Sequence, residues 1–217
     1  IKVVAKKADL VFLCLPDVAS KEIMAAIGDF PCKVIDTSTA FRTTAGWAYG
    51  FPELGESYKT DIATKKHIAN PGCHASGMIA CIAPLVKAGL VPADYPFTIT
   101  SLTGYSGGGK KMIGQYESSP KDYFLYAPRQ YGLGQEHKHL SEVQHVCGIS
   151  EAPIFMPIVD DYYSGMEVTV GIHSRLCHKP VCIDKVQQTL EYFYKDSTIV
   201  TVAPFTENSN SGMLNAN

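Results

Sequence analysis

The fold is decided by residues 10–36, which read LVFLCLPDVASKEIMAAIGDFPCKVID. The run from Leu10 to Leu15 is continuously apolar, as expected of a strand buried on both faces of a parallel sheet. A helix is predicted over Ala19–Ile27, starting near Asp17, and a second buried strand over Lys33–Asp36. A strand, a helix and a strand in this order predict a right-handed parallel crossover, which is part of a doubly wound α/β sheet.

Polar clusters follow both predicted strands, at the sheet edge where ligands of such folds bind. One cluster is Leu15-Pro16-Asp17, and the other runs from Asp36 to Arg42. The planar fork of Arg42 suits a phosphate or a carboxylate, although a surface arginine is an equal alternative. No glycine-rich strand-to-helix fingerprint precedes these elements. Either the protein binds no dinucleotide, or the chain is cut.

The stretch Asn70–Gly77, NPGCHASG, is typical of a tight turn that leads into a helix. Pro71 and Gly72 form turns, and an apolar run ending at Gly89 follows, so Cys73 is predicted at the helix start. Unpaired N–H groups and the helix dipole favour a thiolate there, and they could also hold an oxyanion. The alternative is a buried structural cysteine.

Composition is typical of a globular chain: 217 residues are 46% hydrophobic and 18% charged, with a net charge of −2. This balance suggests neither a nucleic-acid nor a membrane-surface partner. The longest apolar runs are too short to span a bilayer. Seven cysteines without close pairs indicate free thiols in a reducing compartment, and no zinc-binding spacing is present.

A glycine-rich segment, TGYSGGGKK, follows a half-buried strand predicted over Phe97–Leu102. The glycines 107–109 let backbone N–H groups approach an anion such as phosphate, and Lys110 adds positive charge. The alternative, which the segment alone favours, is a mobile hairpin tip or a hinge.

A histidine segment, HKHLSEV at 137–143, begins a short helical pattern that ends near Gly148. On a helix, His139 and Glu142 share a face, so the carboxylate could orient the imidazole. His137 and His139 flank Lys138, and successive residues point to alternate faces if this segment is extended. Solvent-exposed histidines are the alternative, and metal binding lacks a third ligand.

The rest of the chain predicts an α+β layer. Strands of an antiparallel sheet are expected over 153–159 and 165–173, a helix over Asp184–Tyr194 and a last strand over Thr198–Val202. Residues 207–217 are polar.

Five motifs resemble the N-acetyl-gamma-glutamyl-phosphate reductase family in its shorter type, and they occur in the family's order. They are TSTAFR at 37–42, WAYGFPE at 47–53, NPGC at 70–73, GYSGGGK at 104–110 and HKHLSE at 137–142. The family belongs with the aspartate-semialdehyde dehydrogenase-like proteins. The resemblance implies a partial NADP-binding Rossmann domain over 1–72 and an α+β substrate and oligomerisation domain, with a mainly antiparallel sheet, over 73–217.

The resemblance also implies an activity, the NADPH-dependent reduction of N-acetyl-gamma-glutamyl phosphate to its semialdehyde in arginine biosynthesis. Cys73 would form a thioester, and His139 would act as acid and base, supported by Glu142 and with His137 near the substrate. The other implied residues are Arg42, Lys110 and Asn70 for substrate and phosphate, and Leu15, Pro16, Ser38, Gly107, Gly108 and Gly109 for NADP. A cytoplasmic homo-oligomer, a dimer or tetramer, is expected.

Two parts of the family pattern have no counterpart in this sequence, namely the first glycine-rich loop and the last helix. We therefore expect the interior of a longer protein that by itself binds NADPH poorly. The alternative functions are an aspartate-semialdehyde dehydrogenase, a Cys/His thiol hydrolase and a non-catalytic fragment.

Overall fold

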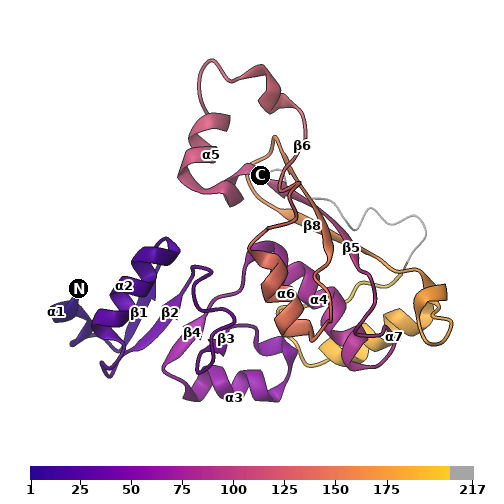
Figure 1. Ribbon diagram of the computed structural model, residues 1–217, viewed down its shortest axis with the longest axis horizontal. Coiled ribbons are helices and arrows are strands. Elements are labelled where there is room, and N and C mark those ends of the chain that lie inside the picture. Colours follow the sequence, from indigo (N-terminus) through magenta and orange to yellow (C-terminus); the bar gives the residue numbers. More distant parts are fainter. Residues whose placement is uncertain (206–217) are drawn as a thin grey trace. The chain divides into compact units, whose positions relative to one another are not determined.

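The structure is a computed structural model that describes residues 1–205 (Figure 1). The chain forms two compact units, one over Ile1–Ser76 and the other from Gly77 onward. Each unit has its own four-stranded sheet.

The first unit is built on a fully parallel sheet with the strand order β1-β2-β4-β3. Its strands are β1 (Leu10–Leu13), β2 (Lys33–Asp36), β3 (Ala48–Tyr49) and β4 (His67–Ala69), and its helices are α1 (Lys2–Ala5), α2 (Asp17–Ile27), the short 3-10 helix η1 (Pro52–Leu54) and α3 (Glu56–Thr64). The predicted strand, helix and parallel strand over residues 10–36 are therefore confirmed.

The prediction that the first strand is buried on both faces is wrong. Val11 and Leu13 pack against a core cluster that includes Ile27 of α2 and Val34 of β2. The alternate residues Leu10 and Phe12 are 42% and 61% exposed. The reason is that β1 lies at the edge of the sheet and is covered on one face only among the described residues, so its continuous apolar run does not report two-sided burial.

The second unit is built on a mixed sheet with the strand order β6-β7-β5-β8. Its strands are β5 (Thr98–Gly104), β6 (Arg129–Gln130), β7 (Ile154–Asp160) and β8 (Met166–Gly171). The β5–β8 and β6–β7 pairings are antiparallel, as predicted, whereas the central β5–β7 pairing is parallel. Parallel pairing became possible because the long connection from 105 to 153 crosses from the end of β5 back to the start of β7.

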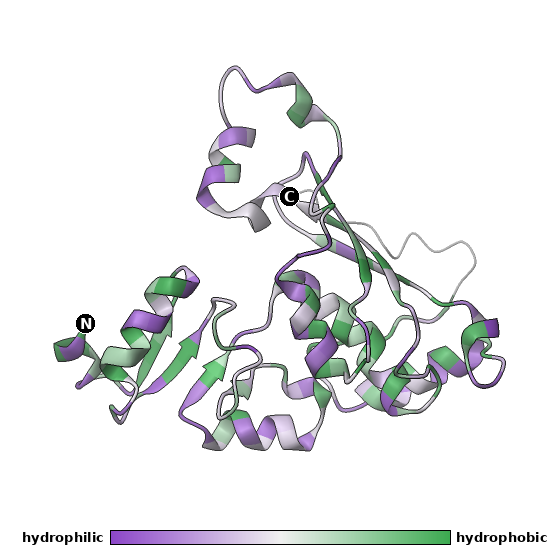
Figure 2. Cartoon of the chain, viewed as in Figure 1, coloured by the Kyte–Doolittle hydropathy of each residue, from purple (hydrophilic) through white to green (hydrophobic). Residues whose placement is uncertain are grey.

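Helices of the second unit are α4 (Cys73–Lys87), which starts in the first unit, α5 (Gly109–Tyr116), α6 (His139–Cys147) and α7 (Ile183–Tyr194), with the 3-10 helices η2 (Tyr105–Gly108), η3 (Tyr123–Tyr126) and η4 (Ser174–Leu176). Helix α4 lies against one face of the sheet, because a Cβ built on Gly77 would be 2.5 Å from Cγ2 of Val168. The Tyr194 hydroxyl donates to the Ala80 carbonyl oxygen at 2.8 Å, which joins α7 to α4. Figure 2 shows that α4 is largely hydrophobic, as a helix packed between other elements should be.

The predicted last strand over Thr198–Val202 is wrong. The backbone N–H groups of Ile199 and Val200 donate to Oγ of Ser197 at 3.2 and 2.9 Å. A local bond from a serine hydroxyl gives the backbone an alternative to a sheet ladder, and the segment forms a turn instead. The polar tail noted from 207 onward lies outside the described residues.

Candidate active site

Cys73 is the first residue of α4, as the sequence predicts. The backbone N–H and the hydroxyl of Ser76 both donate to the Gly72 carbonyl oxygen, at 2.8 and 2.9 Å, and so close the first helical turn. The Cys73 thiol is free and exposed. The alternative of a buried structural cysteine is therefore wrong for this residue, and the sulfur stands where backbone N–H groups point out of a helix.

Hydrogen bonds connect the turn before Cys73, which follows β4, to the carboxyl end of the neighbouring strand β2. The Asn70 N–H donates to the Asp36 carbonyl oxygen at 2.8 Å. Arg42 is 9% exposed, and it donates from Nε to the Asn70 carbonyl oxygen at 2.9 Å and from Nη2 to the Thr37 carbonyl oxygen at 3.1 Å. Arg42 is thus no surface arginine, and two of its donors hold the backbone beside the cysteine turn.

The loop after β2 is ordered by carboxylates. Oδ2 of the buried Asp36 accepts from the N–H and the hydroxyl of Ser38, at 3.1 and 2.6 Å. Asp17, the first residue of α2, accepts from the N–H of Thr39 at 2.9 Å and also from its hydroxyl. Leu15, which lies in sequence between the end of β1 and Asp17, is 38% exposed. The strand ends therefore present a fixed polar loop beside an accessible apolar side chain.

The glycine-rich segment is not an open hairpin tip. It forms η2 and then begins α5, whose first turn carries the exposed Lys110 and Lys111. Figure 2 shows several hydrophilic residues along α5. Gly104, at the start of this segment, lies so close to the loop between β7 and β8 that a Cβ would be 2.7 Å from the carbonyl oxygens of Tyr162 and Tyr163.

The histidine segment places two buried groups on one face of α6. His139 is 4% exposed and Glu142 is 1% exposed, and they are three positions apart on the helix. Their shared face is as predicted. Burial of both side chains contradicts the alternative of solvent-exposed histidines for His139.

His137 lies beside His139, two residues before it and just ahead of α6, which begins at His139. The His139 N–H donates to Nδ1 of His137 at 3.3 Å, and the two ring centroids are 4.8 Å apart. The His137 ring meets Phe155 edge-on at 5.1 Å. Burial, with a smaller effect of Lys138, lowers the pKa of His137 below its usual 6.5. The imidazole is therefore neutral at pH 7 and can accept a proton.

Gln135 is a residue that the sequence analysis missed. Its carboxamide donates to the carbonyl oxygen of Phe155 at 2.9 Å and accepts from the N–H of the same residue at 2.8 Å. Its φ of 57° is unusual for a residue other than glycine. No local pattern marks this role, because the partner strand is 20 positions away in the chain.

The predicted site residues form two groups, one in each unit. The first unit holds Cys73, Asn70, Arg42, Ser38, Leu15 and Pro16, and the second holds His137, His139, Glu142, Gly107, Gly108, Gly109 and Lys110. Within the first group Arg42 and Asn70 are bonded, and within the second the two imidazole rings are in contact.

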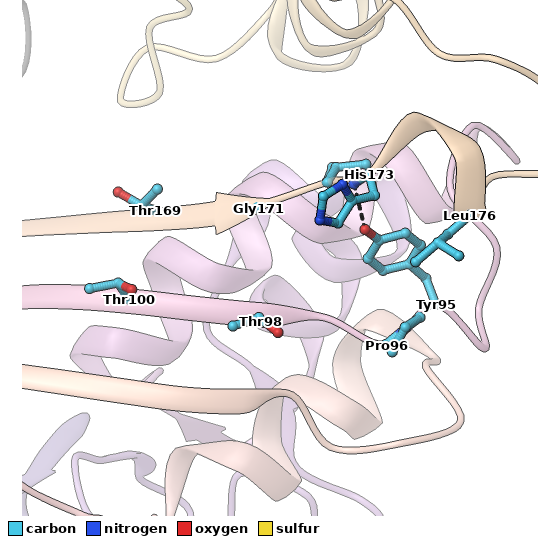
Figure 3. Close-up of a pocket in the computed structure, with 9 residues that line it drawn as sticks. Tyr95, Pro96, Thr98, Thr100, Thr169, Gly171, His173 and Leu176 are labelled. Carbon is cyan, nitrogen blue, oxygen red and sulfur yellow. Dashed lines mark hydrogen bonds between the residues drawn. The ribbon is translucent and has the colours of Figure 1, made fainter.

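The second unit has a hollow of about 530 Å³, and none of the predicted site residues lines it (Figure 3). Thr98 and Thr100 of β5 and Thr169 of β8 line it together with Tyr95 and His173. The Tyr95 hydroxyl accepts the backbone N–H of His173 at 2.6 Å and closes one end. The hollow lies on the sheet face opposite to the one that α4 contacts, because Thr98 and Thr100 alternate with the buried Ile99.

Two features are absent from the described residues 1–205. No helix in this range has the length and apolar character needed to cross a membrane. In the same range no three His, Cys, Asp or Glu residues gather as a metal-binding group.

The cysteines differ sharply in environment, which gives a testable prediction. Burial raises the pKa of Cys147 to about 12, with a further contribution from Cys81, whose own pKa is raised by burial. In the folded protein at pH 8, we expect iodoacetamide to modify the exposed Cys73 at least about a hundredfold faster than Cys147, because the thiolate is the reactive form. Peptide mass spectrometry would measure both rates. Exposed Cys182 serves as the reactive control, and Cys147 reacting first would contradict the structure.

Comparison with known proteins identifies relatives of both units. A family described as semialdehyde dehydrogenase, NAD binding domain, matches residues 2–62, and one described as semialdehyde dehydrogenase, dimerisation domain, matches residues 73–215. N-acetyl-gamma-glutamyl-phosphate reductase 2 of Pseudomonas putida is 43% identical over 197 residues, which are 91% of this chain and 63% of that protein. A reductase of the same name from Sinorhizobium medicae is 38% identical over 211 residues, covering 96% of this chain and 68% of that protein.

Solved structures show the same fold. The crystal structure of aspartate semialdehyde dehydrogenase II from Vibrio cholerae superimposes with a TM-score of 0.68 at 17% identity, over 87% of this chain and 61% of that one. The chain spans 63% of the length of the Pseudomonas putida relative. The resemblance found in the sequence is confirmed, and the chain belongs to the N-acetyl-gamma-glutamyl-phosphate reductase family of the semialdehyde dehydrogenases.

Proposed function

We propose that the protein reduces N-acetyl-gamma-glutamyl phosphate to N-acetylglutamate semialdehyde and phosphate with NADPH, as a step of arginine biosynthesis. The observation that carries the proposal is the exposed, free Cys73 at the first turn of α4. Membership of a reductase family with a NAD-binding domain supports it. A cytoplasmic location is part of the proposal, because the nucleophile must remain a reduced thiol.

Cys73 acts as the nucleophile. Its thiolate forms a bond to the acyl carbon, and the bond from that carbon to the phosphate oxygen breaks, so that phosphate leaves with the electron pair. The product is a thioester on Cys73, and N–H groups at the start of α4 stabilise the charge on the carbonyl oxygen. When bound, the reduced cofactor supplies the hydride that takes the acyl group to the aldehyde level. Cys73 then leaves as a thiolate.

The two histidines are proposed to act in proton transfer. We propose that His139 receives the thiol proton of Cys73 and later exchanges a proton with the substrate oxygen. We propose that the buried Glu142, three positions further along α6, orients the His139 imidazole. His137, which burial keeps neutral at pH 7, is proposed to contact the substrate. Each role is a general acid–base role of the kind that contributes about a hundredfold or more to rate.

Cofactor and phosphate binding are assigned to the remaining predicted residues. The exposed apolar side chain of Leu15, with Pro16 and the ordered Ser38 loop, fits a flat nicotinamide ring and its ribose. We propose that glycines 107–109 contact the cofactor and that Lys110, Arg42 and Asn70 hold substrate phosphate. NADP rather than NAD is the proposed form.

The deciding experiment is an assay in the reverse direction. N-acetylglutamate semialdehyde, phosphate and NADP are supplied, and absorbance of the reduced cofactor is followed. The proposal expects turnover that requires phosphate and is faster with NADP than with NAD. Preference for aspartate semialdehyde would favour the sister dehydrogenase, and hydrolysis of an activated ester without cofactor would favour a thiol hydrolase. No turnover with any of these would leave the non-catalytic alternative.

The second unit matches a dimerisation domain, and we propose that a second copy of the chain covers the open face of its sheet. On this face Ile154, which is 57% exposed, alternates along β7 with the buried Phe155. The hollow of Figure 3 lies on the same face. Exposed apolar area on a sheet face is typical of a subunit interface.

A charge on that face should separate the subunits. We expect Ile154→Asp to lower the oligomer mass measured by sedimentation, because an aspartate would be buried without a partner. Ile199→Asp, also at an exposed apolar residue but outside the sheet, is the control and should keep the wild-type mass. Equal masses for all three proteins would rule out this face as the interface.

A further inference from the structure

We infer that Gln135 is a positioning residue, whose side-chain amide holds the His137–His139 pair in place against strand β7. Three observations inside the second unit carry the inference: the two-bond clamp on Phe155, the positive φ of Gln135, and the contact of the His137 ring with the same Phe155. The inference rests on the proposed acid–base role of the pair.

The side-chain amide of Gln135 bonds Phe155 at the edge of β7 where a neighbouring strand would otherwise pair. Along the outer edge of β7, alternate residues bond outward: Val159 pairs with Arg129 of β6, and the Pro157 carbonyl oxygen accepts the N–H of Tyr131 at 3.1 Å. Phe155 is the next in this series, and β6 does not reach it. The Gln135 amide offers the donor and acceptor that a strand backbone would have supplied.

The same clamp sets the path of the chain into α6. The Gln135 N–H donates to the Gly132 carbonyl oxygen at 3.1 Å and closes a turn, and only two residues further on is His137. Gln135 keeps a φ of 57°. This conformation is unfavourable in free energy for any residue other than glycine, so the surrounding hydrogen bonds must hold Gln135 in it.

His137 is thereby held from both sides. Its ring edge meets Phe155, and its Nδ1 accepts the first N–H of α6. Around the ring lie His139, Lys138 and Tyr131, whose ring centroid is 6.0 Å away. Burial is the main reason for its lowered pKa. Loosening the turn would admit water, break the Nδ1 bond and return the pKa toward the usual 6.5.

The test uses two substitutions that separate the clamp from the backbone strain. Gln135→Ala removes the amide and keeps the strained φ, whereas Gln135→Gly removes the amide and accepts that φ at no steric cost. We expect both variants to lower kcat roughly tenfold with KM changed less than about twofold, because the misplaced group acts on the reaction more than on binding. The NMR titration midpoint of His137 should rise in both variants.

The matched control is Gln144→Ala, which removes a side-chain amide bonded to the Ser150 carbonyl oxygen at the other end of α6. It should leave kcat and the His137 titration unchanged. A Gln135→Gly protein with wild-type kcat and titration would overturn the inference. If the wild-type protein shows no reductase activity while the His137 midpoint still moves in both variants, the clamp stands and the proposed function fails.

Discussion

Cys73→Ser is expected to reduce reductase turnover by at least about a thousandfold, because two steps fail together. A serine hydroxyl at a helix start is rarely ionised at neutral pH, so attack on the acyl phosphate slows. Any oxygen ester that forms accepts hydride less readily than a thioester. The protein should fold normally, since the two side chains differ by one atom and the site is exposed.

The measurement is the phosphate-dependent reverse assay on wild type and variant, with unfolding curves for both. Cys182→Ser is the control, because Cys182 is an exposed cysteine in the second unit outside the proposed site, and it should retain wild-type turnover. Turnover of Cys73→Ser within about tenfold of wild type would mean that this sulfur is not the nucleophile.

Gly104→Ala is expected to lower the free energy of unfolding by about 3 kcal/mol. The added Cβ would be 2.7 Å from the carbonyl oxygens of Tyr162 and Tyr163. These are backbone atoms that cannot turn away, because they accept the N–H groups of Tyr105 and Ser106, each at 2.9 Å. Relief of the contact therefore breaks hydrogen bonds at the end of β5.

Chemical denaturation of Gly104→Ala beside Gly114→Ala checks this prediction. Gly114 lies inside α5, and a Cβ there meets no heavy atom within 4 Å. Its replacement by alanine should stabilise the protein by about 0.5–1 kcal/mol through helix propensity. A Gly104→Ala protein as stable as wild type would show that the end of β5 and the loop between β7 and β8 are not in contact.

Local signals were sufficient for most helices and for the cysteine. Apolar runs closed by turn residues predicted α2 and α4, because helix periodicity and helix ends are set by neighbours in the chain. The order of strand, helix and strand determined that β1 and β2 are parallel. The position of Cys73 followed from the turn before it.

Pairing over long distances in the chain was decided by the tertiary structure alone. The sequence predicted strands over 97–102 and 153–159, but not that these two strands, β5 and β7, lie side by side in parallel. It could not show that β1 is at an edge, since an apolar run looks the same whether one face or two are covered.

The residues of the candidate site divide in the same way. Residue types and motif order identified Cys73, His139 and Glu142 as candidates, because the chemistry of a side chain follows directly from its residue type. The Asn70 carbonyl oxygen that Arg42 binds and the Phe155 backbone groups that Gln135 binds lie 28 and 20 positions away in the chain. Any residue has such groups, so no sequence pattern marks them, and only the folded chain selects which ones meet.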